Sequence, residues 1–255
     1  MFLDCDISAA NGYSSQPQIS RILSERWFRD NAYCLSCQSD RLMQTAANTK
    51  ASDFMCQSCG QDYELKAFQK RPTNTLVDGA YSAMMSRILS DSVPVLMLLE
   101  RTEGWKVRSL TAIHNLFLTP EVIAKRKPLS PTARRAGWVG CNIRLDLIAS
   151  DARLQVVFDG FPNDRDLVRR KFQQFGLLKN IAPSSRGWTT LTLRVIRGLN
   201  RSLFSLGEVY AKEETFVAAF PENGHIRAKI RQQLQVLRDL GYLEFHGSGN
   251  YGLLI

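Results

Sequence analysis

The sequence lacks the signatures of several large protein classes. No apolar run approaches the roughly 20 residues needed to span a bilayer, so we expect no membrane segment. The first fifteen residues, MFLDCDISAANGYSS, include acidic residues and no basic stretch, so we expect no signal peptide and a cytoplasmic protein. A Gly-rich phosphate loop, a nucleophile elbow and a dinucleotide-binding fingerprint are also missing, as are internal repeats. These absences argue against three common classes of enzyme: P-loop nucleotide-binding proteins, α/β-hydrolases with a serine nucleophile, and dinucleotide-dependent enzymes.

Histidine and acidic residues are scarce. The three histidines, His114, His225 and His246, are scattered without the spacing of a metal site or a catalytic triad. The 33 Lys and Arg outnumber the 24 Asp and Glu, which gives a net charge of +9. Residues 101–144 alone hold nine Lys or Arg and only two Glu. Such a basic segment suits a polyanion, since phosphate contacts supply most non-specific affinity for nucleic acid, although it also fits an ordinary solvated face.

Four of the six cysteines form a regular pattern, C-x2-C-x18-C-x2-C. A CxxC turn supplies two thiolates from one tight knuckle, and two knuckles complete the tetrahedron that Zn²⁺ prefers. Because such a site has no open position, we expect a structural zinc rather than a catalytic one. The alternative is a pair of redox CxxC motifs, for which a βαβ context would be expected. The predicted ligands are Cys34, Cys37, Cys56 and Cys59, while Cys5 and Cys141 are left as ordinary thiols.

An acidic pair and a lysine surround the second knuckle. Asp53 precedes Cys56 by three residues, and Glu64 and Lys66 follow Cys59 by five and seven. In a strand, residues two apart point to the same face, so Glu64 and Lys66 would share one. If the knuckle closes the turn, Asp53 lies beside Glu64, and the two carboxylates predict a Mg²⁺ site for phosphodiester cleavage. Asp62 is an alternative or additional ligand, and Ser52 stands where a proline often precedes the aspartate.

The chain also divides in two along its length. Turn formers collect in NIAPSSRG near 180–187, which predicts a domain boundary. Beyond it, three helical patterns are followed by two strand-like runs, the element order of a winged helix, in which the third helix usually enters the DNA major groove. The expected helices cover 188–200, 205–220 and 225–240, and the strands fall within 242–254. Upstream we expect helices over 20–31, 80–91 and 164–178, strands over 93–102 and 153–160, and a loop over 126–140.

Basic and polar residues near these elements are candidate DNA contacts. Two adjacent arginines can clamp phosphates or read guanine, a tryptophan can stack on a base or enclose a methyl group, and glutamine suits adenine. The alternatives to DNA contact are that the tryptophan is a core residue and that the polar residues of the helix form an ordinary solvated face. The candidates are Arg134, Arg135 and Trp138 in the loop, Ser184, Ser185 and Arg186 before the first tail helix, and Lys229, Arg231, Gln232 and Gln235 on the third.

Several stretches of this sequence resemble one known family, in order and at similar separations. They are RILSERW with AYCLSC (21–37), SDFMCQSC with DYELK (52–66), DGAYSAMMSR (78–87), RKPLSPTARRAGWVGCNI (126–143), SSRGWT (184–189) and IRQQLQVLRD (230–239). The sequence thus resembles the DpnI-like methyl-directed type II restriction endonucleases. The resemblance implies an α/β (α+β) fold, with a PD-(D/E)xK nuclease core over 1–182 that embeds the zinc site and a winged-helix domain over 183–255.

The resemblance also implies an activity and a set of residue roles. The substrate would be double-stranded DNA carrying N6-methyladenine at GATC, cut with Mg²⁺. Apart from the resemblance, the sequence shows no obvious dimerisation segment, so we expect a monomer. Asp53 and Glu64 would be the metal ligands and Lys66 the catalytic lysine, Trp138 would help to form the methyladenine pocket, and the winged helix would be a second methyl reader. The alternatives are a non-catalytic zinc-ribbon and winged-helix regulator of DNA, and a related nuclease that cuts unmethylated sites.

Overall fold

The computed structural model describes residues 1–46 and 52–254. Its chain folds into two compact units, each assembled from separate stretches of sequence. Unit 1 comprises Met1–Thr73, Ser92–Asn115 and Asp151–Gly176, and unit 2 comprises Asn74–Asp91, Leu116–Ser150 and Leu177–Ile255. In the described part of the chain, no helix is long and apolar enough to cross a membrane.

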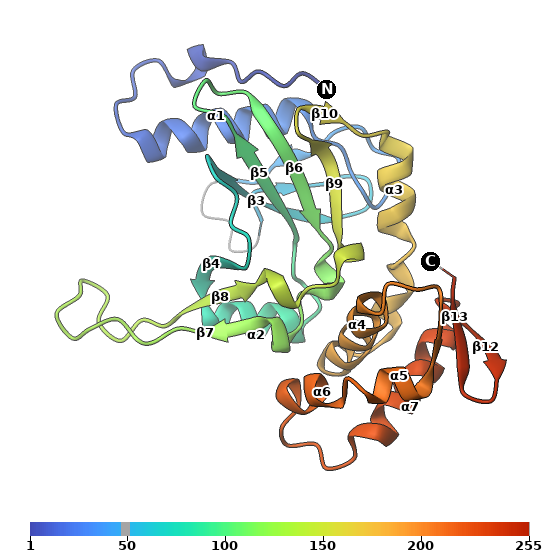
Figure 1. The fold of residues 1–255 in the computed structure, drawn as a ribbon. Helices are drawn as coiled ribbons and strands as arrows, with labels where there is room; N and C mark the ends of the chain where they lie inside the picture. Colours follow the sequence, from blue (N-terminus) through green and yellow to red (C-terminus); the bar gives the residue numbers. More distant parts are fainter. Residues whose placement is uncertain (47–51, 255) are drawn as a thin grey trace. The chain divides into compact units, whose positions relative to one another are not determined.

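Unit 1 is built on a mixed seven-stranded sheet, drawn in Figure 1 with β3, β5, β6 and β9 at its centre. β3 and β5 are parallel, and the other neighbouring pairs are antiparallel. The strand order is β1 (Met43–Gln44), β2 (Phe54–Met55), β3 (Asp62–Phe68), β5 (Val95–Arg101), β6 (Val107–Ile113), β9 (Arg153–Phe158) and β10 (Phe161–Pro162). Because β5 is apolar at nearly every position, it is buried on both faces, as expected of a central strand.

Helices complete the core of unit 1. α1 (Gln16–Asn31) begins with a proline in its first turn, which needs no N–H partner there, and follows the short helix η1 (Ile7–Ala10). It buries Leu23, Trp27 and Phe28 in the same apolar cluster as Tyr63 of β3. α3 (Arg165–Gln173) starts at Asp164, whose carboxylate accepts a hydrogen bond from the Leu167 N–H, and its Phe172 joins this cluster. The apolar residues of α1 and α3 therefore pack against one face of the sheet.

Unit 2 contains a second, three-stranded antiparallel sheet with α2 (Tyr81–Leu89) beside it. Its order is β4 (Thr75–Ala80), β8 (Gly140–Arg144) and β7 (Ile123–Lys125). Residues 126–139 connect β7 to β8 as a long hairpin that extends away from the two strands (Figure 1), and we call this segment the arm. Besides η1, five short 3-10 helices mark connections in the described part of the chain: η2 (Asn115–Phe117), η3 (Pro120–Val122), η4 (Leu145–Leu147), η5 (Ser150–Ala152) and η6 (Gly176–Asn180).

The rest of unit 2 is a helix-turn-helix arrangement with a β wing. Its elements are α4 (Pro183–Gly198), β11 (Leu203–Ser205), α5 (Leu206–Tyr210), α6 (Glu213–Ala219), α7 (Ile226–Asp239), β12 (Leu243–Gly247) and β13 (Asn250–Leu253). The three strands pair in the order β11-β13-β12, all antiparallel. Ile230, Leu234 and Leu237 form the buried stripe of α7, as its 3.6-residue periodicity predicts. This order, helices followed by the β12–β13 hairpin, is that of a winged helix.

The structure corrects several predicted elements. Only the first part of NIAPSSRG is a connection: Asn180 ends η6, Ile181 and Ala182 are non-helical, and Pro183 opens α4 because proline fits the first turn of a helix without losing a hydrogen bond. Ser184 to Gly187 are therefore helical. The helix expected over 205–220 is two helices, α5 and α6, with Ala211 and Lys212 between them. The strands β4, β7, β8 and β11 were missed, since they are short and pair with distant partners.

Candidate metal centre, active site and DNA-binding residues

The four predicted zinc ligands lie together. The Sγ atoms of Cys34, Cys37, Cys56 and Cys59 all lie within 4.8 Å of one another, and none of the six cysteines forms a disulfide. The Cys34–Cys59 and Cys37–Cys56 sulfur pairs are 3.5 and 3.6 Å apart. Sulfurs bound about 2.3 Å from one tetrahedral zinc would be roughly 3.8 Å apart, so the cluster has the size that this ion requires. The donor set is all thiolate, which suits a structural zinc.

Two buried side chains support the first knuckle, and neither was predicted. The hydroxyl of Tyr63 accepts a hydrogen bond from the Leu35 N–H at 2.8 Å and lies 3.3 Å from the Cys34 sulfur. Burial raises the pKa of Tyr63 far above its usual range, so its hydroxyl keeps a proton to donate to a thiolate. Arg169 of α3 donates to the backbone oxygens of Cys34 and Ser39. No sequence pattern singles them out: Tyr63 is an ordinary residue of an alternating strand, and Arg169 is one of several basic residues in a helix.

The register of β2 against β3 brings Asp53 next to Glu64. Phe54 pairs with Tyr63, so the residue before Phe54 lies opposite the residue after Tyr63. The Asp53 N–H donates to the Tyr63 carbonyl at 3.0 Å, and the Leu65 N–H donates to Asp53 Oδ2 at 2.8 Å. The aspartate side chain therefore takes the place of a backbone carbonyl in the strand ladder. This hydrogen bond fixes the carboxylate just before the start of β2.

Glu64 and Lys66 share the face of β3 opposite the core. Glu64 Oε1 lies 2.6 Å from Lys66 Nζ, and the two side chains are half-buried. The intervening Leu65 packs against the apolar cluster, as strand alternation predicts. Asp62, the alternative ligand, accepts a hydrogen bond from the Ser52 hydroxyl at 2.9 Å. The structure thus brings two carboxylates and an ammonium together, which is a set of groups able to bind a hard cation and a phosphate.

A row of paired residues crosses the sheet from Lys66 through Leu98 to two polar residues. Lys66 pairs with Leu98, Leu98 with Thr111, and Thr111 with Gln155. The Thr111 hydroxyl donates to Gln155 Oε1 at 2.9 Å and accepts from Arg71 at 2.7 Å. Neighbouring strands are about 4.8 Å apart, so Arg71 is anchored roughly 10 Å from the Lys66 position. Sequence reasoning missed Arg71, because the pairing of β5, β6 and β9 that creates this row is not a local pattern.

The arm carries the predicted arginines and tryptophan. Arg134 and Arg135 are exposed, and the Arg135 guanidinium lies 4.8 Å from the centre of the Trp138 ring. The Leu129 N–H donates to the Trp138 carbonyl, which pairs the two sides of the arm. A methyl group on Gly140 would lie 2.8 Å from the Trp138 ring, so the indole rests directly on that glycine. Trp138 is therefore half-buried at the base of the arm and is not a core aromatic.

The predicted tail residues differ in exposure. Ser184 and Ser185 are exposed in the first turn of α4, where helix N–H groups face solvent. Arg186 is only 4% exposed, and its guanidinium bonds to Asp91 and to the Leu178 and Ile181 carbonyls. On α7, Arg231, Gln232 and Gln235 are exposed and Lys229 lies above the Trp188 ring, whereas Arg231 also donates to the Tyr210 hydroxyl. The contacts of Arg186 argue for a structural role.

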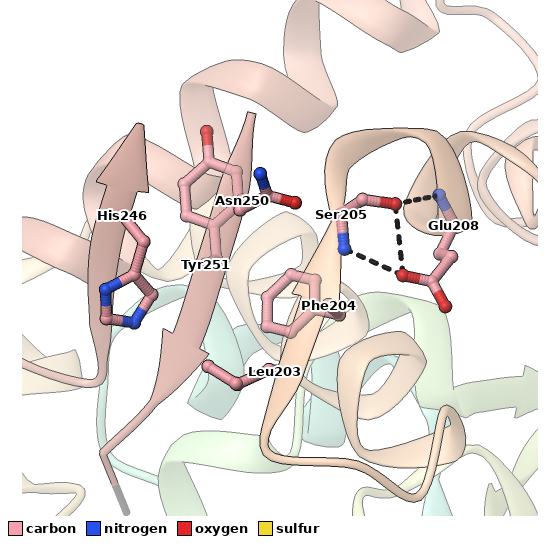
Figure 2. Close-up of a pocket in the computed structure, with 7 residues that line it drawn as sticks. All are labelled: Leu203, Phe204, Ser205, Glu208, His246, Asn250 and Tyr251. Carbon is pink, nitrogen blue, oxygen red and sulfur yellow. Dashed lines mark hydrogen bonds between the residues drawn. The ribbon is translucent and has the colours of Figure 1, made fainter. Parts of the chain in front are cut away.

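A cleft of about 360 Å³ lies beside the wing, between β11, α5 and the β12–β13 hairpin (Figure 2). The Phe204 and Tyr251 rings stack with centroids 5.7 Å apart, and His246 lies on the other side of Tyr251. Ser205 and Glu208 bond to each other in the capping box of α5. Since Ser205 and Glu208 bond to each other and the Asn250 amide donates to the Gly247 carbonyl, we assign the cleft no ligand.

Two models of known protein families together match nearly the whole chain. Residues 1–181 match the model of DpnI, described as the Dam-replacing family, and residues 184–252 match its Dam-replacing HTH domain. The chain belongs to the DpnI family. Membership confirms the resemblance inferred from the sequence motifs, and it implies methyl-dependent DNA cleavage by a restriction enzyme whose partner is DNA. The C-terminal helices and wing are the helix-turn-helix domain of this family.

Proposed function

We propose that this protein is a Mg²⁺-dependent type II endonuclease that cuts both strands of DNA at GATC sites carrying N6-methyladenine. The observation that carries the proposal is the juxtaposition of Asp53, Glu64 and Lys66 on the paired strands β2 and β3, in a chain of the DpnI family. A non-catalytic DNA-binding member would have no need for two carboxylates beside a lysine. The regulator alternative is therefore the weaker one.

In this proposal, Asp53 and Glu64 hold the cation and Lys66 acts on the attacking water. Carboxylate oxygens are the ligands that Mg²⁺ prefers, and its other positions take water and phosphate. Bound Mg²⁺ would lower the pKa of that water and neutralise charge on the phosphorus. When the metal binds Glu64, the ion pair between Lys66 and Glu64 would break. The freed Lys66 ammonium would then orient the water or stabilise the transition state. The bond between Asp53 and the Leu65 N–H keeps the first ligand in place meanwhile.

Methyl selectivity requires more than one contact. An N6-methyl adds apolar bulk at the major-groove edge of adenine, where an aromatic wall such as Trp138 senses it by contact. One methyl group in a pocket is worth only about 1–3 kcal/mol. We propose that Trp138 in the first domain and the exposed Gln232 and Gln235 of α7 in the second each read a methylated site, because two readings multiply the discrimination. Arg134 and Arg135 of the arm would supply phosphate contacts.

The domain boundary, the zinc and the oligomeric state complete the proposal. We place the catalytic domain at 1–182 and the DNA-binding domain at 183–255, close to the two family matches, and we propose that the protein acts as a monomer in the cytoplasm. A structural Zn²⁺ on the four cysteines would fix the hairpin that carries Asp53 and Glu64. Ser184 and Ser185 stay in the proposed DNA surface at the start of α4, and so do Lys229 and Arg231. We omit Arg186 because its donors bind Asp91 and backbone carbonyls.

The test is cleavage of adenine-methylated plasmid DNA by the wild-type protein and by Lys66→Ala, with Mg²⁺ or with a chelator. The wild type should cut with Mg²⁺ only, whereas Lys66→Ala should retain DNA binding and lose cleavage, because the acidic ligands remain and the group acting on water is removed. Lys70→Ala, an exposed lysine just beyond β3, is the matched control and should cut normally. DNA binding without cleavage by the wild type would instead support the regulator, and cleavage by Lys66→Ala would refute the role of that lysine.

A further inference from the structure

Arg71 lies on the same face of the sheet as Lys66, and the mechanism proposed above gives it no role. Its guanidinium donates to the Thr111 hydroxyl at 2.7 Å, and that hydroxyl donates to Gln155 Oε1 at 2.9 Å. Thr111 is only 2% exposed, so it offers the arginine one fixed acceptor. Side chains of directly paired residues share a face of the sheet. The pairing of Lys66 with Leu98, and of Leu98 with Thr111, therefore places the guanidinium on the Lys66 side.

The positive charge of Arg71 has no counter-ion among the described residues, because its hydrogen-bond partner there is a neutral hydroxyl. Two buried arginines differ in this respect. The Arg169 guanidinium lies 3.1 Å from the carboxylate of Asp40. That of Arg186 lies 2.7 Å from Asp91. A half-buried cation without a counter-ion loses solvation and gains no Coulomb energy in return, so an anion that binds beside Arg71 would supply the missing charge.

Hydrogen-bond donors beside Thr111 remain open to such an anion. A guanidinium has five N–H groups, and Arg71 uses one of its nitrogens on Thr111. Because Thr111 binds the Gln155 oxygen, the amide N–H groups are what that side chain still offers. In the described part of the chain, none of these nitrogens is both closed to solvent and unpaired, so an anion can reach them. Donors without a carboxylate suit an anion rather than a metal ion.

We propose that Arg71 binds a backbone phosphate beside the one that is cut, and that Thr111 and Gln155 keep its guanidinium in position. The anchor lies two strand spacings, roughly 10 Å, from the Lys66 position, so it serves a neighbouring phosphate rather than the one at Lys66. A neutral anchor leaves the full charge for the phosphate, whereas an aspartate would compete with it. The planar guanidinium matches two phosphate oxygens. The inference rests on the proposed function, which brings DNA to this face, and adds a positioning residue to it.

The test is binding of the full-length protein to a GATC duplex without Mg²⁺, measured at several salt concentrations. Arg71→Gln should weaken binding roughly tenfold at low salt. The plot of log affinity against log salt should become shallower by about 0.9, because one phosphate contact and its released counter-ion are lost. The glutamine amide can still donate to Thr111, so the fold should persist. Arg29→Gln is the matched control, since Arg29 pairs with Asp30 on α1, at the core face of the sheet, and should change neither value.

Two further variants separate the charge from its anchor. Arg71→Lys keeps the charge and loses the planar fork, so the salt slope should match that of the wild type while the affinity falls about threefold. Thr111→Val keeps the shape of the buried side chain and removes the acceptor that holds the guanidinium. Its salt slope should also be unchanged, and its affinity should fall about threefold because the arginine must then be ordered on binding. A purely structural role of Arg71 would lower the melting temperature of Arg71→Gln and leave its salt slope unchanged.

Cleavage shows which phosphate Arg71 contacts. A contact to a neighbouring phosphate is made equally before and during the reaction, so it strengthens binding without accelerating the chemical step. With Mg²⁺ and saturating protein, the single-turnover rate of Arg71→Gln should therefore stay within about threefold of the wild type. Methylated and unmethylated duplexes should be bound more weakly by the same factor, since phosphate contacts carry no sequence information.

Three results would overturn the inference. An unchanged salt slope in Arg71→Gln, or an equal change in Arg29→Gln, would show that Arg71 contacts no phosphate. A loss of rate at saturation as large as that of Lys66→Ala would place Arg71 at the scissile phosphate, and a loss of binding confined to methylated DNA would make it a base reader. The two failures are distinguishable: DNA binding without any cleavage by the wild type refutes the proposed activity and still tests Arg71, whereas normal cleavage with an unchanged slope refutes only the Arg71 contact.

Discussion

At the scale of single residues, Tyr63 links the cysteine cluster of the first unit to the strand that carries Glu64 and Lys66. It is fully buried, its hydroxyl contacts Leu35 and Cys34 of the first knuckle, and the next residue in the strand is Glu64. A shift of the knuckle is therefore transmitted to the strand that holds the acidic pair. Because side chains alternate along a strand, Tyr63 faces the core and Glu64 faces the opposite side. The same strand therefore packs in the core on one face and carries a proposed metal ligand on the other.

Tyr63→Phe should destabilise the protein by about 1–3 kcal/mol. The substitution keeps the ring and removes the acceptor of the Leu35 N–H, which is then left buried and unpaired. The measurement is chemical denaturation of the zinc-loaded protein. Tyr33→Phe is the matched control, since Tyr33 is equally buried but its hydroxyl has no hydrogen-bond partner among the described residues, so its loss should be neutral or stabilising. Equal effects of the two substitutions would refute the role of the Tyr63 hydroxyl.

At the scale of secondary-structure elements, the knuckles stabilise a hairpin that is too short to stand alone. β2 has only two residues, Phe54 and Met55, and it pairs with β3 immediately beyond the second knuckle. So short a strand pair is marginal in water without further support. The four cysteines and the Arg169 contacts from α3 provide that support from both sides. The cysteine cluster and its surroundings thus lie directly beside the strand pair whose register places Asp53 opposite Glu64.

Cys56→Ser should lower both the zinc content and the melting temperature. Loss of one ligand opens a closed tetrahedral site, and structural zinc contributes folding free energy directly, so we expect a decrease of about 10 °C or more. Metal analysis and thermal unfolding are the measurements. Cys141→Ser is the control, because Cys141 is also buried but lies outside the cluster. A Cys56→Ser protein that is zinc-free, stable and fully active would show that the metal has no structural role.

The sequence predicted those elements that depend on local patterns. α1 and α7 have helical periodicity, β5 is an apolar run, and the CxxC pairs bring their own geometry. β4, β7 and β8 were not predictable, because each has only three to six residues and is defined by pairing with segments far along the chain. The same reason hid Arg71 and Arg169, whose partners come from other elements. Arg186 lies in a polar, turn-like stretch, yet the structure buries it against Asp91, which lies 95 residues earlier.

At the scale of the whole molecule, sequence order and packing divide the chain differently. The family matches run continuously over 1–181 and 184–252. The compact unit that contains the helix-turn-helix elements also includes β4, α2, β7, β8 and the arm from earlier in the chain. The basic arm and α7, which are the two proposed methyl-reading regions, therefore belong to one unit, and the acidic pair with Lys66 belongs to the other. In this account, unit 2 recognises the methyl groups and unit 1 cleaves the DNA.

The most direct measurement of the central claim is the single-turnover rate of cleavage on one GATC duplex, methylated on both strands or on neither. With Mg²⁺ and excess protein, the account predicts cleavage of the methylated duplex at least about 30-fold faster, since each of two methyl groups contributes about 1–3 kcal/mol. Lys66→Ala should cut neither duplex while binding the methylated one. Equal rates on the two duplexes, or binding of methylated DNA with no cleavage by the wild-type protein, would contradict the account.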